Sequence, residues 1–367
     1  MTPELDEYLA KLQSQNLVRR LTYQNGVDFS SNDYLGLSGK QEAIKAGTQA
    51  AEQFGTGSAG SRLLSGNKPI FENFERQIAI DKKAETALIF NSGYVANLSV
   101  ISALSSLGYL IIFDKLNHAS MYQGLNNANL VRFNHLKYSQ LVRILEKYKD
   151  YPKKLIASET VFGMDGDIAD LQTLSDLAKR HDALLYLDEA HATGLYGQNG
   201  YGFSTEVNLD PNSTIIMGTF SKALASCGAY VACPLSLKNY LVQVSKGFIY
   251  STALSPFCIG VAQYNWRELP NLNNVRREIL KKADYLRQNL LNRDLEITKG
   301  CTNIISIIFK STKLMLVTHE KLLQKNIITS AVRRPTSPTP RIRLAINANH
   351  SYEDINLLIG SLYDISA

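Results

Sequence analysis

Short apolar runs alternate with amphipathic segments between about residues 85 and 232, and this alternation limits the possible folds more than any other feature. The intervening segments have helical periodicity; Leu171, Leu174 and Leu177, for example, follow a candidate helix cap at Asp170. The runs that have the length and composition of buried strands are residues 86–90, 109–114, 154–159, 183–188, 214–217 and 228–232. The alternation predicts an α/β fold with a mostly parallel central sheet and helices on both faces.

The pattern changes after about residue 263. We expect a long helix over residues 274–291, short strands over 303–309 and 341–346, and a last helix over 354–363. These elements indicate a second, smaller α+β domain. The expected organisation is an N-terminal arm, a large α/β domain and a small C-terminal domain, with bounds 1–40, 41–262 and 263–367.

Composition argues against several classes of function. The formal net charge is +6, but the basic residues are dispersed along the chain, so we do not expect nucleic-acid binding. Mild basicity would suit acidic small molecules or an acidic carrier protein. No apolar run approaches the roughly 20 residues that a membrane helix needs, so we expect no membrane association.

The compartment is indicated by the N-terminal stretch and by the cysteines. The sequence MTPELDEYLAKLQSQNL is polar and partly acidic, which is not the pattern of a secretory signal. The cysteines form no CxxC pair and suit a reducing compartment; they are Cys227, Cys233, Cys258 and Cys301. We therefore expect a cytoplasmic protein.

The glycine-rich stretch GTGSAG at residues 55–60 formally matches the dinucleotide-binding pattern GxGxxG. That pattern should follow a strand and open a helix. Here a helical segment, QEAIKAGTQAAEQF, comes before it, so we interpret the stretch as a flexible glycine loop. The chain also contains no GxxxxGK[ST] phosphate loop.

Lys222 is the only charged residue within TIIMGTFSKALASCGAYVACP, residues 214–234. Apolar strands are predicted on both sides of it. A lysine between two buried strands requires a reason, because burial disfavours the ammonium form. Either the ammonium reaches water, or the protein uses an amine at this position.

Polar residues follow other predicted strands. Asp188 and Glu189 end the strand in LYLDEAHATG, with His191 shortly after, and His118 follows a strand in DKLNHAS. Open α/β sheets bind ligands at the carboxyl ends of their strands. Each signal alone has an ordinary alternative: a solvated acidic turn, a structural histidine, or a metal site, for which no further His or Cys cluster is present.

Taken together, these residues suit one cofactor. The segment FNSGYVAN places Gly93 at a strand-to-helix turn, where unpaired N–H groups attract phosphate. Asp188 could pair with a protonated ring nitrogen, and Lys222, with its pKa lowered by burial, could form a Schiff base with an aldehyde. A phosphorylated aromatic aldehyde with these partners is pyridoxal 5′-phosphate.

The same residues, in this order, resemble the α-oxoamine synthases, a family of fold-type I pyridoxal-phosphate enzymes. The resemblance covers nearly the whole chain and is carried by the segments SSNDYLGLSG, GTGSAGSRLLSGN, FNSGYVAN, DKLNHAS, ETVFGMDGDIADL, LYLDEAHATGLYG, TFSKAL, IYST and RIRLAI. The family condenses an amino acid with an acyl thioester. The resemblance therefore implies a fold-type I transferase.

The resemblance also implies roles for individual residues. Lys222 would carry the cofactor and act as the base at Cα, and Asp188 would pair with the ring nitrogen. His118 would stack on the cofactor ring, and His191 would bond its phenolic oxygen or the incoming acyl group. The residues implied to hold the phosphate are Ser92, Gly93, Tyr94 and Thr219, with Ser251 and Thr252 reaching the phosphate of a neighbouring subunit. The last pair implies a homodimer with shared active sites.

Substrate contacts follow in the same way. Arg343 resembles a carboxylate-binding arginine, Thr336 a substrate-contacting threonine and Arg19 an acyl-site arginine. NDYLGL and MDGDIADL are most similar to the branch that joins L-alanine to a pimeloyl thioester, pimeloyl-CoA or pimeloyl-ACP, in biotin biosynthesis. Its products are 8-amino-7-oxononanoate, CO2 and the thiol carrier. The alternatives are a glycine C-acetyltransferase and a non-catalytic binding protein of the same fold.

Three positions depart from the family pattern. Gly163 stands where relatives usually have serine, Lys68 where they often have histidine, and the loop RRPTSPTPRIRL, which begins at Arg333, is about two residues shorter than usual. The first two concern single contacts, and the third concerns recognition of the acyl chain. None of them affects the expected Schiff-base chemistry.

Overall fold

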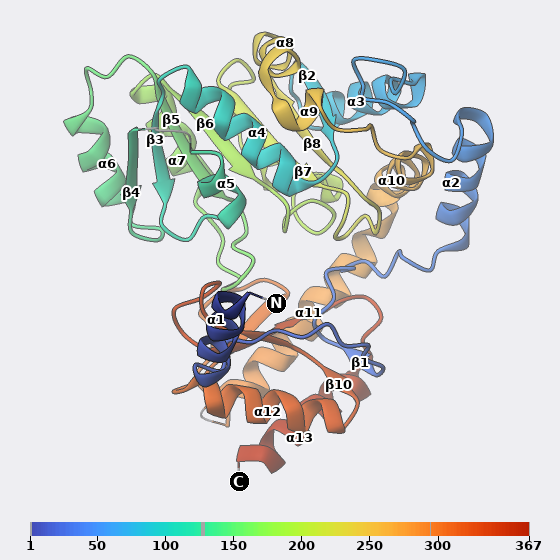
Figure 1. Cartoon of the computed structure of the whole chain (residues 1–367), viewed down its shortest axis with the longest axis vertical. Helices are drawn as coiled ribbons and strands as arrows, with labels where there is room; N and C mark the ends of the chain where they lie inside the picture. Colours follow the sequence, from blue (N-terminus) through green and yellow to red (C-terminus); the bar gives the residue numbers. More distant parts are fainter. Residues whose placement is uncertain (1, 126–128, 294, 367) are drawn as a thin grey trace. The chain divides into compact units, whose positions relative to one another are not determined.

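The computed structural model describes residues 2–125, 129–293 and 295–366, which fall into two compact units (Figure 1). The first unit comprises Asp33–Phe162 and Ile168–Arg276, and the second comprises Met1–Asn32, Gly163–Asp167 and Arg277–Ala367. The second unit thus contains most of the expected N-terminal arm together with the C-terminal elements. The domain boundaries at residues 40 and 262 remain predictions.

A seven-stranded sheet forms the centre of the first unit. Its strands, in spatial order, are β2 (Thr86–Phe90), β8 (Ala229–Cys233), β7 (Thr214–Thr219), β6 (Ala183–Asp188), β5 (Lys154–Glu159), β3 (Leu110–Asp114) and β4 (Asn129–Phe133). Only β8 runs antiparallel to its neighbours β2 and β7; the other pairs in the sheet are parallel. The prediction of a mostly parallel sheet is confirmed.

Helices cover both faces of this sheet (Figure 1). Their bounds, with three short 3₁₀ helices, are α2 (Gln41–Phe54), α3 (Pro69–Asp81), α4 (Gly93–Ser106), α5 (Ala119–Gln123), α6 (Tyr138–Lys147), α7 (Leu171–Arg180), η1 (Gln198–Gly200), η2 (Phe203–Thr205), α8 (Leu235–Val244), α9 (Lys246–Ile249), α10 (Pro256–Glu268) and η3 (Leu269–Leu272). Side chains alternate along β3: Ile111 and Phe113 pack with α4, whereas Leu110 and Ile112 pack with α6 and α7. Burial on both faces explains the near-continuous apolar runs in the sequence.

The second unit is a smaller α+β structure. In its three-stranded sheet, β12 (Arg341–Ala345) lies between β11 (Ser330–Val332) and β9 (Ile304–Ile308), antiparallel to both. A separate parallel pair joins β1 (Val27–Asp28) to β10 (Ile327–Ile328). The helices are α1 (Pro3–Ser14), α11 (Asn273–Leu291), α12 (Thr312–Gln324) and α13 (Tyr352–Ser366). The two helices and two strands expected here from the sequence are all present.

The edge strand β4 was not predicted. Asn129 is exposed and Leu130, Val131 and Arg132 are at least partly exposed, so the segment lacks the buried run that identified the other strands. β4 pairs only with β3. A strand with a single neighbour at a sheet edge needs little apolar character, and sequence patterning gives little signal for it.

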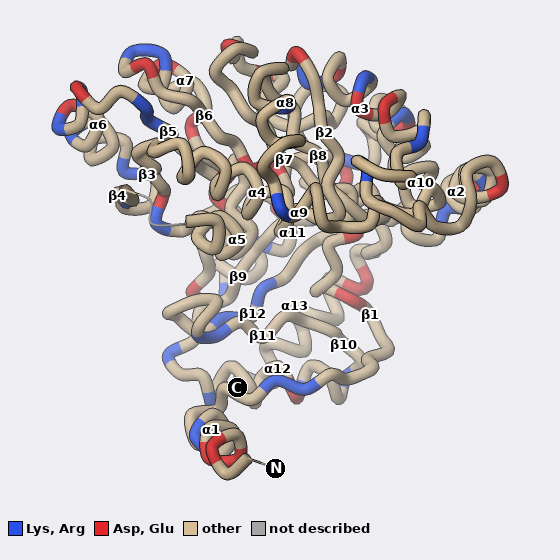
Figure 2. The backbone as a smooth tube through the Cα atoms, turned by 45° about the horizontal axis from the view of Figure 1, so that its top comes forward, with Lys and Arg blue, Asp and Glu red and all other residues tan. Residues whose placement is uncertain are grey.

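Two other sequence interpretations can be compared with the structure. The glycine loop at residues 55–60 follows α2 rather than a strand, as expected. Lys and Arg occur on elements of both units (Figure 2). Within the described ranges, no helix is long and apolar enough to cross a membrane.

Helix α7 provides a test of how local sequence sets an element boundary. The Asp170 side chain accepts a hydrogen bond from the Thr173 N–H at 2.9 Å and another from its hydroxyl at 2.6 Å. The Thr173 hydroxyl, and then its N–H, lower the pKa of Asp170 from its ordinary 3.8. Because the folded pKa lies below the unfolded one, the cap stabilises above about pH 4 and is lost as pH falls through the folded value.

We expect Asp170→Ala to lower the free energy of unfolding at pH 7 by about 1 kcal/mol, the usual cost of losing an N-cap. Urea unfolding followed by circular dichroism measures the change. Asp176→Ala, an exposed position within the same helix, is the matched control and should have little effect. Equal losses in the two variants would contradict the capping role.

Candidate active site

The strands β5, β6 and β7 are parallel neighbours, so their carboxyl ends meet at one edge of the sheet. A cavity of about 260 Å³ opens there. Of the residues predicted from the sequence, the lining includes Ser92, Gly93, Tyr94, His118, Asp188, His191, Thr219 and Lys222. It also includes Asn97, Ser120, Glu159, Ala190, Met217 and Ser221, which were not predicted. Chain segments more than a hundred residues apart therefore contribute to one site.

Asp188 is the last residue of β6 and is 4% exposed. Its Oδ1 accepts a hydrogen bond from the Ala190 N–H at 2.9 Å, and its Oδ2 accepts one from the Asn97 amide at 2.8 Å. Carboxylate oxygens accept hydrogen bonds, and the donors on both oxygens fix the orientation of this carboxylate. Asp188 is therefore suited to hold a positive charge at the cavity.

The turn after Asp188 is fixed from behind by a buried ion pair. Glu189 pairs with Lys82, and neither side chain is exposed. Glu189 also accepts hydrogen bonds from the Ser204 N–H at 2.7 Å and the Ser204 hydroxyl at 2.9 Å. Burial lowers the pKa of Lys82, and the charge of Glu189 opposes this shift. A Cβ at Gly202 would collide with the Glu189 carboxylate, so glycine is required there.

Lys222 lies in the loop between β7 and β8. The loop is closed by hydrogen bonds from the Phe220 N–H to the Gly228 carbonyl and from the Ser226 N–H to the Phe220 carbonyl, both 2.8 Å. The Lys222 Nζ lies 2.8 Å from His191 Nε2, and His191 Nδ1 lies 2.7 Å from the buried Tyr34 hydroxyl. The lysine therefore reaches a polar chain at the cavity, which answers why a charged residue occurs between two buried strands.

His118 is the N-cap of α5, and its Nδ1 lies 2.7 Å from the Ser120 hydroxyl. Desolvation is the main cause that lowers the pKa of His118; the charge of Asp188 raises it, and that of Lys222 lowers it further. The imidazole is therefore neutral at pH 7. A neutral ring accessible from the cavity suits contact with a flat aromatic molecule.

The start of α4 supplies backbone donors. The Ser92 hydroxyl accepts from the Val95 N–H at 3.2 Å, and the Ser92 carbonyl accepts from the Ala96 N–H at 3.0 Å. Gly93 and Tyr94 are thus the first two helical residues, whose N–H groups have no intrahelical acceptor. This end of the helix, with its partial positive charge, faces the cavity and suits a phosphate.

Thr219 and Ser221 line the same region. The Thr219 hydroxyl donates to the Gly228 carbonyl at 2.9 Å and accepts from the Ser221 N–H at 3.2 Å. The two hydroxyls are 2.8 Å apart, so the Ser221 hydroxyl donates to Thr219, whose proton is already committed to Gly228. Ser221 therefore holds a hydroxyl at the cavity beside the predicted residue Thr219.

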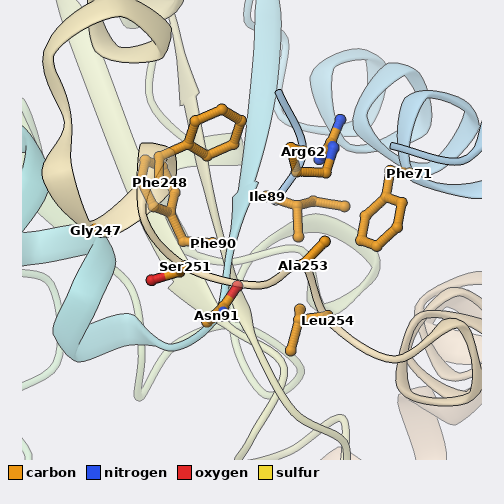
Figure 3. Close-up of a pocket in the computed structure, with 10 residues that line it drawn as sticks. All are labelled: Arg62, Phe71, Ile89, Phe90, Asn91, Gly247, Phe248, Ser251, Ala253 and Leu254. Carbon is orange, nitrogen blue, oxygen red and sulfur yellow. The ribbon is translucent and has the colours of Figure 1, made fainter. Parts of the chain in front are cut away.

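Ser251 and Thr252 do not line this cavity. Ser251 lines a separate cavity of about 10 Å³, room for one water, with Asn91 and Phe248 (Figure 3). The carbonyl of Thr252 accepts a hydrogen bond from the Asn91 amide at 2.7 Å. Their predicted contact was with a neighbouring subunit, and that role remains a prediction.

The predicted substrate residues belong to the second unit. Arg343 is 4% exposed and donates to the Gly163 carbonyl and, at 3.2 Å, to Asn32 Oδ1. Arg19 donates to the Arg334 carbonyl at 3.2 Å, and Thr336 is exposed. Gly163, one of the three departures from the family pattern, thus contributes a backbone acceptor to Arg343. The substrate-binding roles remain predictions.

The residues that sequence reasoning missed differ in the signal that they give. Asn97 could have been found, because it lies one helical turn after Gly93 and is the only amide in a helix without charged residues. Tyr34 lies in the recognised segment NDYLGL, and Glu159 ends a predicted strand. Lys82 gives no local signal, since its only distinguishing property is a partner more than a hundred residues away.

The sequence matches a known family over almost its whole length. The profile of the family described as aminotransferase class I and II matches residues 24–362. The chain belongs to this family. The 8-amino-7-oxononanoate synthase of Trichlorobacter lovleyi is 38% identical over 340 residues, which cover 91% of this chain and 87% of that protein.

Two solved structures show the same relationship. The 8-amino-7-oxononanoate synthase from Francisella tularensis has a TM-score of 0.79 at 28% identity, and the match covers 93% of this chain and 98% of that one. A variant serine palmitoyltransferase from S. paucimobilis, solved with a PLP–myriocin aldimine, has a TM-score of 0.89 at 26% identity and covers 99% of this chain and 97% of that one. The predicted fold-type I class, α-oxoamine synthase relationship and pyridoxal-phosphate cofactor are confirmed.

The residues at the cavity fit this cofactor. The start of α4 offers N–H groups to a phosphate, and Asp188 offers a carboxylate for a protonated ring nitrogen. Lys222 offers an amine for the aldehyde. The charges and donors therefore match each polar part of pyridoxal phosphate. Among the residues with described structure, no group of three or more His, Cys, Asp and Glu side chains could hold a metal ion.

Lys82→Met is expected to lower the free energy of unfolding by about 3–5 kcal/mol, because it leaves the buried Glu189 carboxylate without its counter-ion. Urea unfolding at pH 7 measures the loss. The matched control is Lys281→Met, whose pair with Glu278 is exposed (65% and 49%) and should be dispensable. A loss as small as that of the control would contradict an anchoring role for the pair.

Proposed function

We propose that the chain is an 8-amino-7-oxononanoate synthase that condenses L-alanine with a pimeloyl thioester and releases CO2 and the thiol carrier. The observation that carries the proposal is the single cavity containing Lys222, Asp188, His118 and His191. The curated relatives, named 8-amino-7-oxononanoate synthases, support the choice of reaction. The acyl carrier is coenzyme A or an acyl carrier protein.

Lys222 is the central residue. Pyridoxal phosphate, when bound through its aldehyde to the Lys222 amine, supplies a ring that withdraws electrons from the amino-acid Cα. Lys222 would also be the base that takes the Cα proton of L-alanine and returns a proton to the product. His191, 2.8 Å from the Lys222 Nζ, holds the amine at the cavity and can exchange a hydrogen bond with it in either direction.

Asp188 and His118 complete the work of the first unit. Asp188, oriented by hydrogen bonds to both of its oxygens, would face the cofactor ring nitrogen and favour a proton on it. His118 would pack its neutral ring on the cofactor face, fix the ring orientation and exclude water. Orientation of this kind contributes several kcal/mol to catalysis in enzymes. The N–H groups at the start of α4 would hold the phosphate, and the Thr219 hydroxyl would join them by turning its proton from the Gly228 carbonyl to the phosphate.

Substrate recognition, assembly and compartment complete the proposal. Arg343 is the residue proposed for the amino-acid carboxylate, with Thr336 and Arg19 for the acyl substrate. Ser251 and Thr252 serve the phosphate of a second subunit, so the enzyme is a homodimer with shared sites. Its compartment is the cytoplasm, where the thioester carriers occur.

We expect Lys222→Ala to abolish turnover and to remove the yellow absorption of a lysine-bound cofactor, because no other amine among the described lining residues replaces it. Visible spectra of the purified protein with added cofactor measure this directly. Lys149→Ala, an exposed lysine on the same unit, is the control and should keep both properties. Steady-state turnover by Lys222→Ala would sink the assignment.

Asp188→Asn should retain the cofactor but lose most of the rate.

Amino-acid preference distinguishes the proposed reaction from its alternatives. L-Alanine should perturb the visible spectrum of the holoenzyme more strongly than glycine does. Addition of pimeloyl-CoA should then lead to release of free thiol from the thioester and of CO2 from the amino acid. Parallel spectral titrations with the two amino acids test this. A glycine-selective response with acetyl-CoA would indicate a glycine C-acetyltransferase. Cofactor binding without thiol release from any acyl-CoA or any acyl carrier protein thioester would indicate a non-catalytic protein.

A further inference from the structure

The Asn97 side chain is hydrogen-bonded to Asp188 directly and to His118 through Ser120. These are the two residues proposed to hold the cofactor ring. Asn97 lies in α4, is 1% exposed, and is one helical turn beyond Gly93. Its Nδ2 donates to Asp188 Oδ2 at 2.8 Å and to the Ser120 hydroxyl at 2.9 Å. An amide nitrogen has two protons, so both are used by these two acceptors.

The orientation of this amide follows from its third partner. The Tyr186 hydroxyl donates to Asn97 Oδ1. Tyr186 and Asp188 are two residues apart in β6, so their side chains point to the same face of the sheet, the face that α4 covers. The opposite amide orientation would place Oδ1 against the ionised oxygen of Asp188, with no proton between them.

The direction of every hydrogen bond beyond Asn97 is then set. The Ser120 hydroxyl accepts from Asn97, so its own proton is available to His118 Nδ1, 2.7 Å away. The Ser120 N–H also donates to Nδ1, at 3.3 Å. With Nδ1 accepting, the imidazole proton is on Nε2. A network of hydrogen bonds therefore runs from Tyr186 through Asn97 and Ser120 to His118, with a branch from Asn97 to Asp188.

We propose that Asn97 is a positioning residue that orients the Asp188 carboxylate and, through Ser120, fixes the ring orientation and Nε2–H tautomer of His118. The proposal rests on the proposed function for its purpose, since it concerns the two residues that hold the cofactor ring. One buried amide would then position both the carboxylate that faces the ring nitrogen and the imidazole that packs on the ring.

The variants separate the two branches of this network, one to Asp188 and one through Ser120 to His118. Asn97→Leu keeps the side-chain shape and removes both donors. Ser120→Ala removes the hydroxyl donor to His118 Nδ1, at 2.7 Å, and leaves the longer bond from the N–H of residue 120, at 3.3 Å. Tyr186→Phe removes only the group that orients the amide. Asn265→Leu is the matched control. Asn265 is an equally buried amide in the same unit, and its Nδ2 donates to the Leu224 carbonyl at 2.9 Å, which is not part of the network.

The primary readout is the ¹⁵N NMR spectrum of the histidines in the cofactor-free protein, which reports tautomer and charge without any turnover. The chain has six histidines, and His118 is assigned by its loss in His118→Gln. The native ring should be neutral with its proton on Nε2. In Ser120→Ala and Asn97→Leu we expect an Nδ1–H population and a higher pKa for His118. Asp188 and Lys222 are the charged groups that act on it, and Glu159 lines the same cavity.

The second readout is the dissociation constant of pyridoxal phosphate. Asn97→Leu should weaken binding roughly tenfold to a hundredfold, because a hydrogen bond to the charged Asp188 is lost. Ser120→Ala should change it by less than about threefold, as it leaves that bond in place. Asn265→Leu should change neither readout, even if it lowers stability. If Asn97→Leu does not fold, Tyr186→Phe and Ser120→Ala still decide the point.

The proposal is overturned if the His118 signals of Ser120→Ala and Tyr186→Phe match those of the native protein. It is also overturned if Asn265→Leu shifts them equally. Failure of the proposed reaction would leave the NMR result unchanged, since that measurement needs neither substrate nor catalysis. The two hypotheses can therefore fail separately.

Discussion

The candidate site depends on the buried ion pair between Glu189 and Lys82. Asp188 and His191 lie on either side of Glu189 in one turn, and that turn leaves the sheet at the end of β6. A turn at a sheet edge is ordinarily mobile, because it has few packing partners. Here the Glu189 side chain points away from the cavity and binds Lys82 and Ser204. These contacts hold the turn, and they therefore hold Asp188 and His191 in place at the cavity.

This arrangement has an energetic consequence. Two charges removed from water are not a strong source of net stability, since desolvation offsets most of their attraction. Removing one of them is costly, however, because the other is left buried. The pair therefore acts less as a source of folding free energy than as a penalty on any conformation in which the turn moves. A device of this kind suits a site where a carboxylate and an imidazole must keep a fixed separation.

Much of this organisation could be predicted from the sequence, and the reason is periodicity. The strands β3, β5, β6 and β7 are buried on both faces, so each appears as an apolar run, and the polar residues that end them mark the edge where ligands bind. Lys222 and Asp188 were identified because each departs from its apolar surroundings, and Gly93 because it lies at a turn between a predicted strand and a predicted helix. Lys82 and the edge strand β4 could not be identified in this way. Lys82 stands in an ordinary polar stretch, and only the tertiary fold brings it to Glu189; β4 is too exposed to give a buried pattern.

The surroundings of Lys222 show how one amine can serve at two stages of a reaction. Nζ lies 2.8 Å from His191 Nε2, and His191 Nδ1 lies 2.7 Å from the Tyr34 hydroxyl. A charged amine donates to Nε2, which requires Nδ1 to carry the ring proton and donate to Tyr34. A neutral amine can instead accept from Nε2, with Tyr34 donating to Nδ1. Both directions use the same heavy-atom positions, because an imidazole and a hydroxyl can each donate or accept. The chain from Tyr34 to Lys222 can therefore reverse its protons as the amine changes charge, while the turn fixed by Glu189 keeps the imidazole in place.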